Sequence, residues 1–289
     1  MAEAGKASLQ SWRGDKRGEL TSTEEKIENR SYRMNVEYEK EGKIAYFTLN
    51  RPEALNTLSP DLMHELHDAF EDFKTDDKLS VGIITGTGEK AFCAGADIKT
   101  WLPFVKETKT KPWLFPSTPM RDMELWKPII AAINGIAMGG GLELALACDL
   151  RIASEKARFA SPEVKLGIMS RLGGTARLPD LIGLTKAAEM MLMGDPIDAQ
   201  EAYRIGLVNK VVPPEQVMTV AKEWAEKLCK VSPLSSRRIK EALIKNRGLS
   251  IEEALWTENM LALPLYETED YEEGRKAFKE KRSPDFKAK

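Results

Sequence analysis

One apolar stretch constrains the fold of this 289-residue chain more than any other feature. Residues 128–147 read PIIAAINGIAMGGGLELALA, which is almost long enough to cross a bilayer and contains the pattern Gly135-x-x-x-Gly139. Glu143 lies inside the stretch, however, and three successive glycines at 139–141 would break a membrane helix. A carboxylate at the bilayer centre costs about 3 kcal/mol. The segment therefore predicts a buried strand, a glycine turn and a helix, and no membrane span.

The sequence on either side of this stretch predicts strands that alternate with helices. Apolar or alternating runs indicate strands at 43–49, 81–85, 128–133, 149–154 and 207–212. Helical periodicity predicts helices at 59–75, 185–193, 198–205, 214–230, 233–246 and 251–267, with Ser235 and Ser250 as starts of the last two. The polar stretch 100–127 receives no element. An α/β fold with a helical C-terminal part follows.

Composition narrows the class of function. The chain has 43 Lys and Arg against 45 Asp and Glu, a net charge of −2, which argues against a nucleic-acid binder. Its three cysteines lack metal-site or disulfide spacing, and the two histidines, His64 and His67, fall on a predicted helix, so no metal site is expected. Residues 1–33 lack the apolar core of a secretory signal and contain acidic residues, which transit peptides avoid. We expect a polar extension on a cytoplasmic protein, with an organelle matrix as the alternative.

The sequence contains one partial match to a nucleotide-binding motif. Gly86-x-Gly88-x-x-Ala91 follows a predicted strand, as in dinucleotide-binding folds. The following residues, FCAGAD, have no helical periodicity, so a pyrophosphate would find no helix N-terminus there. A P-loop is excluded because no glycine-rich run ends in Gly-Lys-Ser/Thr.

Two carboxylates are candidates for catalysis. The run Gly139–Gly141 at a predicted helix start presents free backbone N–H groups and partial positive charge, which suit a developing oxyanion. Glu143 lies three residues after Gly140, in the first turn, and is either catalytic or simply favoured by the helix dipole. Glu163, on a loop or helix start, would complete an acid–base pair acting on a carbonyl compound. The spacing in sequence leaves open whether the two converge in space.

Several segments, in order, resemble the enoyl-CoA hydratase/isomerase (crotonase) superfamily. They are NRPEALNTL (50–58), AFCAGADI (91–98), AAINGIAMGGGLELALACDLRIAS (131–154), ARFASPEVKLGI (157–168), GGTARL (173–178), GDPIDAQEAYRIGLV (194–208) and AFKEKR (277–282). The resemblance implies an α/β spiral of ββα units with C-terminal helices that build trimers or dimers of trimers. It also implies three regions, a polar extension (1–33), the spiral core (34–215) and a helical C-terminal region (216–289).

The resemblance further implies an enoyl-CoA hydratase, which adds water reversibly to a trans-2-enoyl-CoA to give a 3-hydroxyacyl-CoA without any cofactor besides the CoA thioester. The backbone N–H groups of Ala96 and Gly140 would form the oxyanion hole, Glu143 would activate water and Glu163 would deliver a proton to Cα. The partners expected are the acyl-CoA substrate and identical subunits, with no nucleic acid and no membrane. Residues matching the CoA site are Ala54, Leu55, Ala94, Ala96, Asp97, Ile98 and Lys99, and, reaching a neighbouring subunit's CoA, Phe278 and Lys281.

Departures from the family pattern concern the acyl end of the site. Ser161 stands where Gln is frequent, and Ser170–Arg171–Leu172–Gly173–Gly174 replaces a Pro-Gly-Ala-Gly-Gly run. The acyl-pocket candidates are Trp101, Trp113, Phe115 and Arg171, the last of which could meet a polar acyl group or point to the surface. The alternatives are therefore another crotonase-type reaction, namely isomerisation, dehydration of a specialised 3-hydroxyacyl-CoA or thioester hydrolysis, and, from another class, a non-catalytic scaffold or RNA-binding protein.

Overall fold

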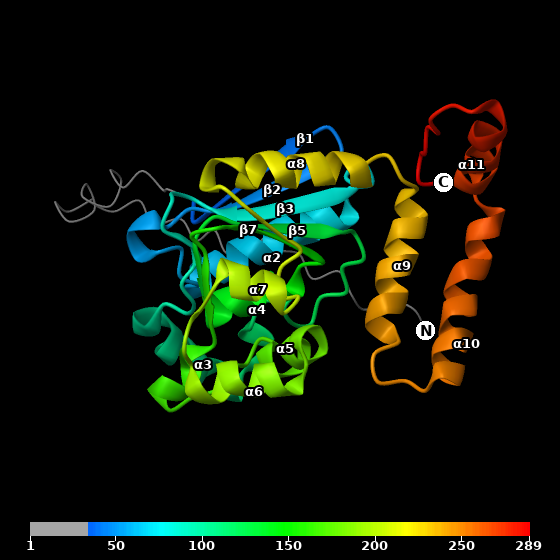
Figure 1. Cartoon of the computed structure of the whole chain (residues 1–289). Coiled ribbons are helices and arrows are strands. Elements are labelled where there is room, and N and C mark those ends of the chain that lie inside the picture. Colours follow the sequence, from blue (N-terminus) through cyan, green and yellow to red (C-terminus); the bar gives the residue numbers. More distant parts are fainter. Residues whose placement is uncertain (1–33) are drawn as a thin grey trace, which may run out of the picture. The chain divides into compact units, whose positions relative to one another are not determined.

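Two β-sheets organise residues 34–289, which the computed structural model describes (Figure 1). The predicted polar extension 1–33 lies outside the described residues. The larger sheet has the strand order β1 (Val36–Glu41), β2 (Ile44–Leu49), β3 (Val81–Gly86), β5 (Ile129–Ile133), β7 (Leu150–Ser154) and β10 (Lys210–Val212). The smaller sheet has the order β4 (Ala91–Cys93), β6 (Ile136–Met138), β8 (Arg158–Ala160) and β9 (Ile197–Asp198).

The chain repeats a ββα unit. The strand pairs β3–β4, β5–β6 and β7–β8 each place their first strand in the larger sheet and their second in the smaller one. Neighbouring repeats pair in parallel in both sheets. The units end in helices: α3 (Ile98–Thr110), α4 (Gly140–Ala147), and the 3-10 helix η3 (Pro162–Leu166) followed by α5 (Gly174–Ile182). Because every repeat adds one strand to each sheet, the chain advances as a spiral, and the predicted α/β fold is confirmed.

Apolar side chains cover both faces of the larger sheet. On the inner face, Phe47 packs against Phe70 and Phe73 of α2 (Pro60–Thr75), with ring centroids 4.5 and 5.6 Å apart. On the outer face, α8 (Val217–Leu228) inserts Val220 and Ala221 against a second apolar cluster that includes Ile83 (Figure 1). Thus α8, although it falls in the predicted C-terminal region 216–289, packs on the sheet. The boundary at 215/216 stays a prediction.

The other helices that overlap predicted ones are α6 (Leu184–Met193), α7 (Ala199–Arg204), η4 (Pro214–Gln216), α9 (Pro233–Lys245), α10 (Ile251–Ala262) and η5 (Leu263–Glu267). Three helices fall outside the predicted ranges, namely η1 (Pro52–Ala54), η2 (Pro112–Leu114) and α11 (Glu269–Glu280). Ser250 begins α10 with a capping box, as expected. The expected start of α9 at Ser235 is wrong, because the Oγ of Ser232 accepts the N–H of Ser235 and caps a helix that Pro233 opens.

Two further expectations need correction. The stretch 100–127 contains most of α3, in which Pro103 and several threonines and lysines weaken the helical pattern. The stretch 128–147 contains two strands, β5 and β6, where one was predicted. β6 has no recognisable sequence signal because it is only three residues long and too short to show an alternating pattern. Among residues 34–289, no helix is long and apolar enough to span a membrane.

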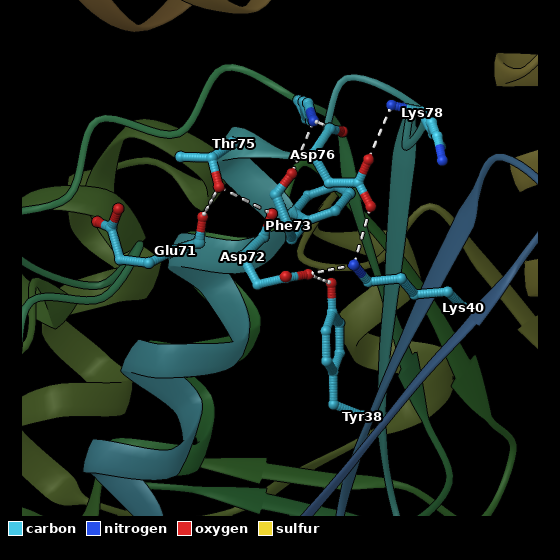
Figure 2. A network of polar contacts seen from close by, with 9 residues as sticks. Tyr38, Lys40, Glu71, Asp72, Phe73, Thr75, Asp76 and Lys78 are labelled. Carbon is cyan, nitrogen blue, oxygen red and sulfur yellow. Dashed lines mark hydrogen bonds and ion pairs between the residues drawn. The ribbon is translucent and has the colours of Figure 1, made fainter.

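Polar side chains hold the C-terminal end of α2 against the sheet. Figure 2 shows Asp72 accepting from the Tyr38 hydroxyl at 2.7 Å, and Lys40 of β1 bridging Asp72 and Asp76 at 2.6 and 2.8 Å. Such partly exposed ion pairs contribute at most about 1 kcal/mol. Lys127 is different because it is buried and its Nζ donates to the carbonyl oxygens of Phe73 and Asp76 at 2.7 and 2.6 Å. It satisfies the Phe73 carbonyl, one of those that a helix end leaves unpaired, and shares the Asp76 carbonyl with the Leu79 N–H, which donates at 3.0 Å.

We predict that Lys127→Met destabilises the protein by about 2 kcal/mol, because methionine fills the same space and leaves the buried Phe73 carbonyl without its donor, while the Asp76 carbonyl keeps only the Leu79 N–H. Lys78→Met is the matched control, since Lys78 is exposed beyond the same helix end. Urea unfolding monitored by circular dichroism measures both variants. Equal midpoints for the two variants would contradict the role assigned to Lys127.

Candidate active site

The glycine run positions Glu143 at the start of α4. Gly139 adopts φ 52° and ψ −123°, a backbone conformation that side chains disfavour, and its N–H donates to the Ala160 carbonyl at 3.0 Å. A Cβ on Gly141 would collide with the carbonyl oxygen of Cys93, so only glycine lets α4 pack on β4. This close packing places Glu143, in the first turn, in the interior with 4% of its surface exposed.

The loop Ser170–Gly174 satisfies the buried carboxylate of Glu143. Its Oε1 accepts the backbone N–H groups of Leu172 and Gly174 at 2.7 and 2.9 Å. Arg177 supports this loop by donating to the Leu172 carbonyl at 2.9 Å. Burial raises the pKa of Glu143 above its ordinary value, and the two N–H donors oppose the shift while the charge of Glu163 adds to it.

Glu163 lies on η3 beside the same glycines. A Cβ added to Gly139 would lie 3.5 Å from the Glu163 Oε1. The hydroxyl of Ser161 donates to Oε2 at 2.8 Å, and that of Ser170 donates to Oε1 at 3.2 Å. The structure therefore brings together two glutamates that lie twenty residues apart in sequence, around the start of α4.

The two predicted oxyanion donors, the backbone N–H groups of Ala96 and Gly140, lie close together at the start of α4. Leu58 forms a parallel bridge with Ala96, in which Leu58 donates to Gly95 and accepts from Asp97. The Ala96 N–H consequently points away from Leu58. A Cβ on Gly140 would lie 3.8 Å from the Ala96 nitrogen, so the two predicted oxyanion donors are neighbours. Within residues 34–289, neither N–H donates a hydrogen bond. Two free donors near a helix N-terminus are suited to a developing oxyanion.

The predicted CoA residues fall into two groups. In the first, Leu55 has a left-handed backbone and accepts the N–H of Ala94 at 3.0 Å, so the segments 54–58 and 94–98 run side by side. This group continues with Asp97 and with the exposed Ile98 and Lys99 of the first turn of α3. In the second group, Phe278 lies in the last turn of α11, where it is 87% exposed, and Lys281 is the C-cap of the same helix.

Asp97 has a structural function that the sequence reading missed. Its Oδ2 binds Arg51 at 2.8 Å, and its Oδ1 caps α3 by accepting the Lys99 N–H at 3.2 Å. The hydrogen bond from Arg51 lowers the pKa of Asp97. Because Arg51 also donates to the Thr57 carbonyl at 2.8 Å, the Arg51–Asp97 pair connects the two segments.

The acyl-pocket candidates are divided in the structure. Trp101 and Phe115 pack with ring centroids 5.9 Å apart, and both contact Phe104, which the sequence reading did not single out. Trp113 is 75% exposed on η2. Arg171 is exposed, and no ion pair joins it to another residue in the described part of the chain. Helical spacing of Trp101 and Phe104 was the available signal for this aromatic cluster.

Comparisons with known proteins identify the family of this chain. The family model for enoyl-CoA hydratase/isomerase matches residues 39–289. The chain belongs to the enoyl-CoA hydratase/isomerase family. Two relatives are each 43% identical, namely "(E)-benzylidenesuccinyl-CoA hydratase" of Thauera aromatica, over 88% of this chain and 99% of that protein, and "Short-chain-enoyl-CoA hydratase" of Clostridium acetobutylicum, over 86% and 95%. A crystal structure of an enoyl-CoA hydratase from Bacillus anthracis superposes with a TM-score of 0.81 at 38% identity, covering 88% of this chain and all of that one. The family predicted from the sequence is confirmed.

The described residues 34–289 hold no group of three or more His, Cys, Asp and Glu side chains that could bind a metal ion. The polar atoms gathered at the start of α4 are instead carboxylates, hydroxyls and backbone N–H groups. Such a set handles protons and a carbonyl oxygen.

We predict that Glu143→Gln stabilises the folded protein at pH 7 by about 1 kcal/mol. Because folding raises the pKa of Glu143, its ionisation destabilises the folded state as pH rises through the unfolded and then the folded pKa. Glutamine stays neutral, so the advantage of the variant should shrink as the pH falls below the ordinary glutamate value of about 4.3.

Thermal unfolding of wild type and variant between pH 4 and 8 measures this difference. The exposed Glu155 offers a matched control, and Glu155→Gln should show no such pH-dependent gap. A Glu143→Gln variant that is less stable than wild type at pH 7 would show that burial does not penalise this charge.

Proposed function

We propose that this chain adds water to a trans-2-enoyl-CoA and gives the 3-hydroxyacyl-CoA. The observation that carries the proposal is the arrangement of two glutamates, Glu143 and Glu163, around two free N–H donors, those of Ala96 and Gly140. The enoyl-CoA hydratase activity predicted from the sequence agrees with the names of relatives that share about 40% of their residues with this chain.

The reaction begins at the thioester carbonyl. Its oxygen would accept both N–H groups, and the partial positive charge at the start of α4 would stabilise the enolate oxygen that develops there. Withdrawal of electrons through the conjugated double bond makes Cβ electrophilic. Mutational loss of one such donor typically costs about 3–4 kcal/mol of transition-state stabilisation.

The two glutamates would then complete the addition of water. Ionised Glu143 takes a proton from water while the hydroxide oxygen bonds to Cβ, and protonated Glu163 gives its proton to Cα as the enolate collapses. The product gains one water molecule. Glu143 ends protonated and Glu163 ionised, so exchange of one proton through solvent restores both. No cofactor is required, since the CoA thioester supplies the electrophile.

The segments 54–58 and 94–99 would hold CoA, because they run side by side and end at the Ala96 donor. Phe278 and Lys281 would act on the CoA of a neighbouring subunit, which requires an oligomer. A homotrimer or a dimer of trimers is supported by exposed apolar side chains on α9 and α10, namely Ile239, Leu243, Leu255, Trp256 and Met260. Apart from identical subunits, the acyl-CoA substrate is the only partner that we propose. We place the protein in the cytoplasm or in an organelle matrix.

We predict that Glu143→Gln and Glu163→Gln each lower kcat for crotonyl-CoA hydration by about 100-fold or more, because general acid–base catalysis typically contributes 10²–10⁴-fold. Loss of absorbance of the conjugated thioester measures the rate. Mass spectrometry of the products separates hydration from isomerisation and thioester hydrolysis. Glu155→Gln again serves as the control and should keep wild-type turnover. The assignment fails if both glutamine variants hydrate crotonyl-CoA at the wild-type rate.

The acyl group is proposed to extend toward Arg171, whose neighbours Ser170 and Leu172 contact the two glutamates. An unpaired guanidinium at this point would bind a carboxylate carried by the acyl group. The relative named for (E)-benzylidenesuccinyl-CoA supports this proposal, since a succinyl thioester retains one free carboxylate.

We predict that Arg171→Ala reduces kcat/KM about tenfold for an enoyl-CoA with a terminal carboxylate and leaves crotonyl-CoA within about twofold. Arg158→Ala, at another exposed arginine, is the control. The comparison requires only steady-state kinetics on two substrates. Equal effects on both substrates would exclude Arg171 from acyl recognition.

A further inference from the structure

Two buried hydroxyls surround the carboxylate of Glu163. Ser161 is 4% exposed and Ser170 is 7% exposed, and each donates to a different oxygen of Glu163, Oε2 at 2.8 Å and Oε1 at 3.2 Å. The two serine oxygens lie 3.5 Å from each other. The carboxylate is thus held at both oxygens by side chains that can also accept a hydrogen bond.

Neither hydroxyl serves the local backbone in the usual way. Ser161 occupies the N-cap of η3, but its side chain makes no capping hydrogen bond there. A Cβ on Gly174 would lie 2.6 Å from the Ser170 Oγ, so the glycine at 174 leaves the room that this hydroxyl occupies. The nitrogen of the same Gly174 donates to Glu143. One short loop therefore positions both glutamates.

The two carboxylates differ in the kind of donor they receive. The backbone N–H groups that bind Glu143 can only donate, so they favour its ionised form. The hydroxyls that bind Glu163 can act either as hydrogen-bond donors or as acceptors. When Glu163 carries a proton on Oε2, that proton can be donated to the Ser161 oxygen, the Ser161 proton can turn toward Ser170, and Ser170 can keep donating to Oε1. Both protonation states of Glu163 then keep their hydrogen bonds.

We propose that Ser161 and Ser170 form a hydroxyl clamp that aims Glu163 at Cα and supports it as both proton donor and proton acceptor. The clamp rests on the proposed hydratase function, in which Glu163 must release a proton and regain it in every cycle. The serines act through Glu163 and are positioning residues.

The clamp is tested with Ser161→Ala, Ser170→Ala and the double variant. We expect kcat for crotonyl-CoA hydration to fall about tenfold in each single variant and further in the double variant, with KM within about twofold of wild type. Ser161→Thr keeps the hydroxyl and should recover most of the activity lost in Ser161→Ala. Ser154→Ala removes another buried hydroxyl, at the end of β7, and should not change kcat.

A second measurement distinguishes a loss of Glu163 orientation from a general loss of folding. Hydration in D₂O by wild type should place one deuterium at Cα in a single configuration, because one positioned acid delivers it. In the double variant, delivery from solvent competes, and NMR of the product should show both configurations.

The outcomes distinguish failure of the hydroxyl clamp from failure of the proposed hydratase function. If wild type hydrates crotonyl-CoA and Glu163→Gln does not, a double serine variant with wild-type kcat and a single configuration at Cα would overturn the clamp alone. If wild type hydrates no enoyl-CoA, the proposed function is overturned and the clamp with it.

Discussion

The carboxylate of Glu143, buried at the start of α4 and bound by two backbone N–H groups, is the interaction on which the rest of this site depends. Burying an ionisable group is unfavourable unless hydrogen bonds compensate. Leu172 and Gly174 provide that compensation, and Arg177 holds their loop by donating to the carbonyl oxygen of Leu172. Gly141 is required because a Cβ there would collide with the Cys93 carbonyl oxygen of β4, and Gly139 because its backbone has a positive φ that residues with a side chain rarely adopt.

The spiral explains why distant residues meet at this point. Successive ββα units place the ends of β4, β6 and β8 next to each other in the smaller sheet. Ala96 follows β4, Gly140 follows β6 and Glu163 follows β8, so each repeat delivers one functional group to the same edge. Parallel pairing makes this convergence a property of the topology. The loop Ser170–Gly174 then adds hydrogen bonds to both glutamates.

The sequence predicted the parts of this arrangement that have a local physical signal. Helical periodicity over 59–75 predicted α2, and the glycine run predicted a helix start with Glu143 in its first turn. Convergence of Glu143 and Glu163 had no local signal, because it arises from the pairing of β6 with β8. The expectation that both glutamates act in one site came from the resemblance to the family.

Other elements were missed for identifiable reasons. β1 has the sequence VEYEKE, in which the solvent-facing acids and lysine obscure the alternating pattern of a strand. Its Lys40 forms ion pairs with Asp72 and Asp76 at the end of α2. Arg177 donates to the Leu172 carbonyl, and Asp97 binds Arg51, which lies 46 residues earlier in the chain. Residue type alone reveals neither contact. Phe115 joins Trp101 and Phe104 only because the chain after α3 folds back along that helix, which helical spacing within α3 does not reveal.

A crystal structure with a bound, non-hydrating enoyl-thioester analogue of CoA tests the central claim most directly. The account predicts that the thioester oxygen lies about 3 Å from both the Ala96 and the Gly140 nitrogen. It also predicts that Cβ faces Glu143 and Cα faces Glu163. A carbonyl oxygen bound away from these two nitrogens, or an acyl group that contacts neither glutamate, would contradict it.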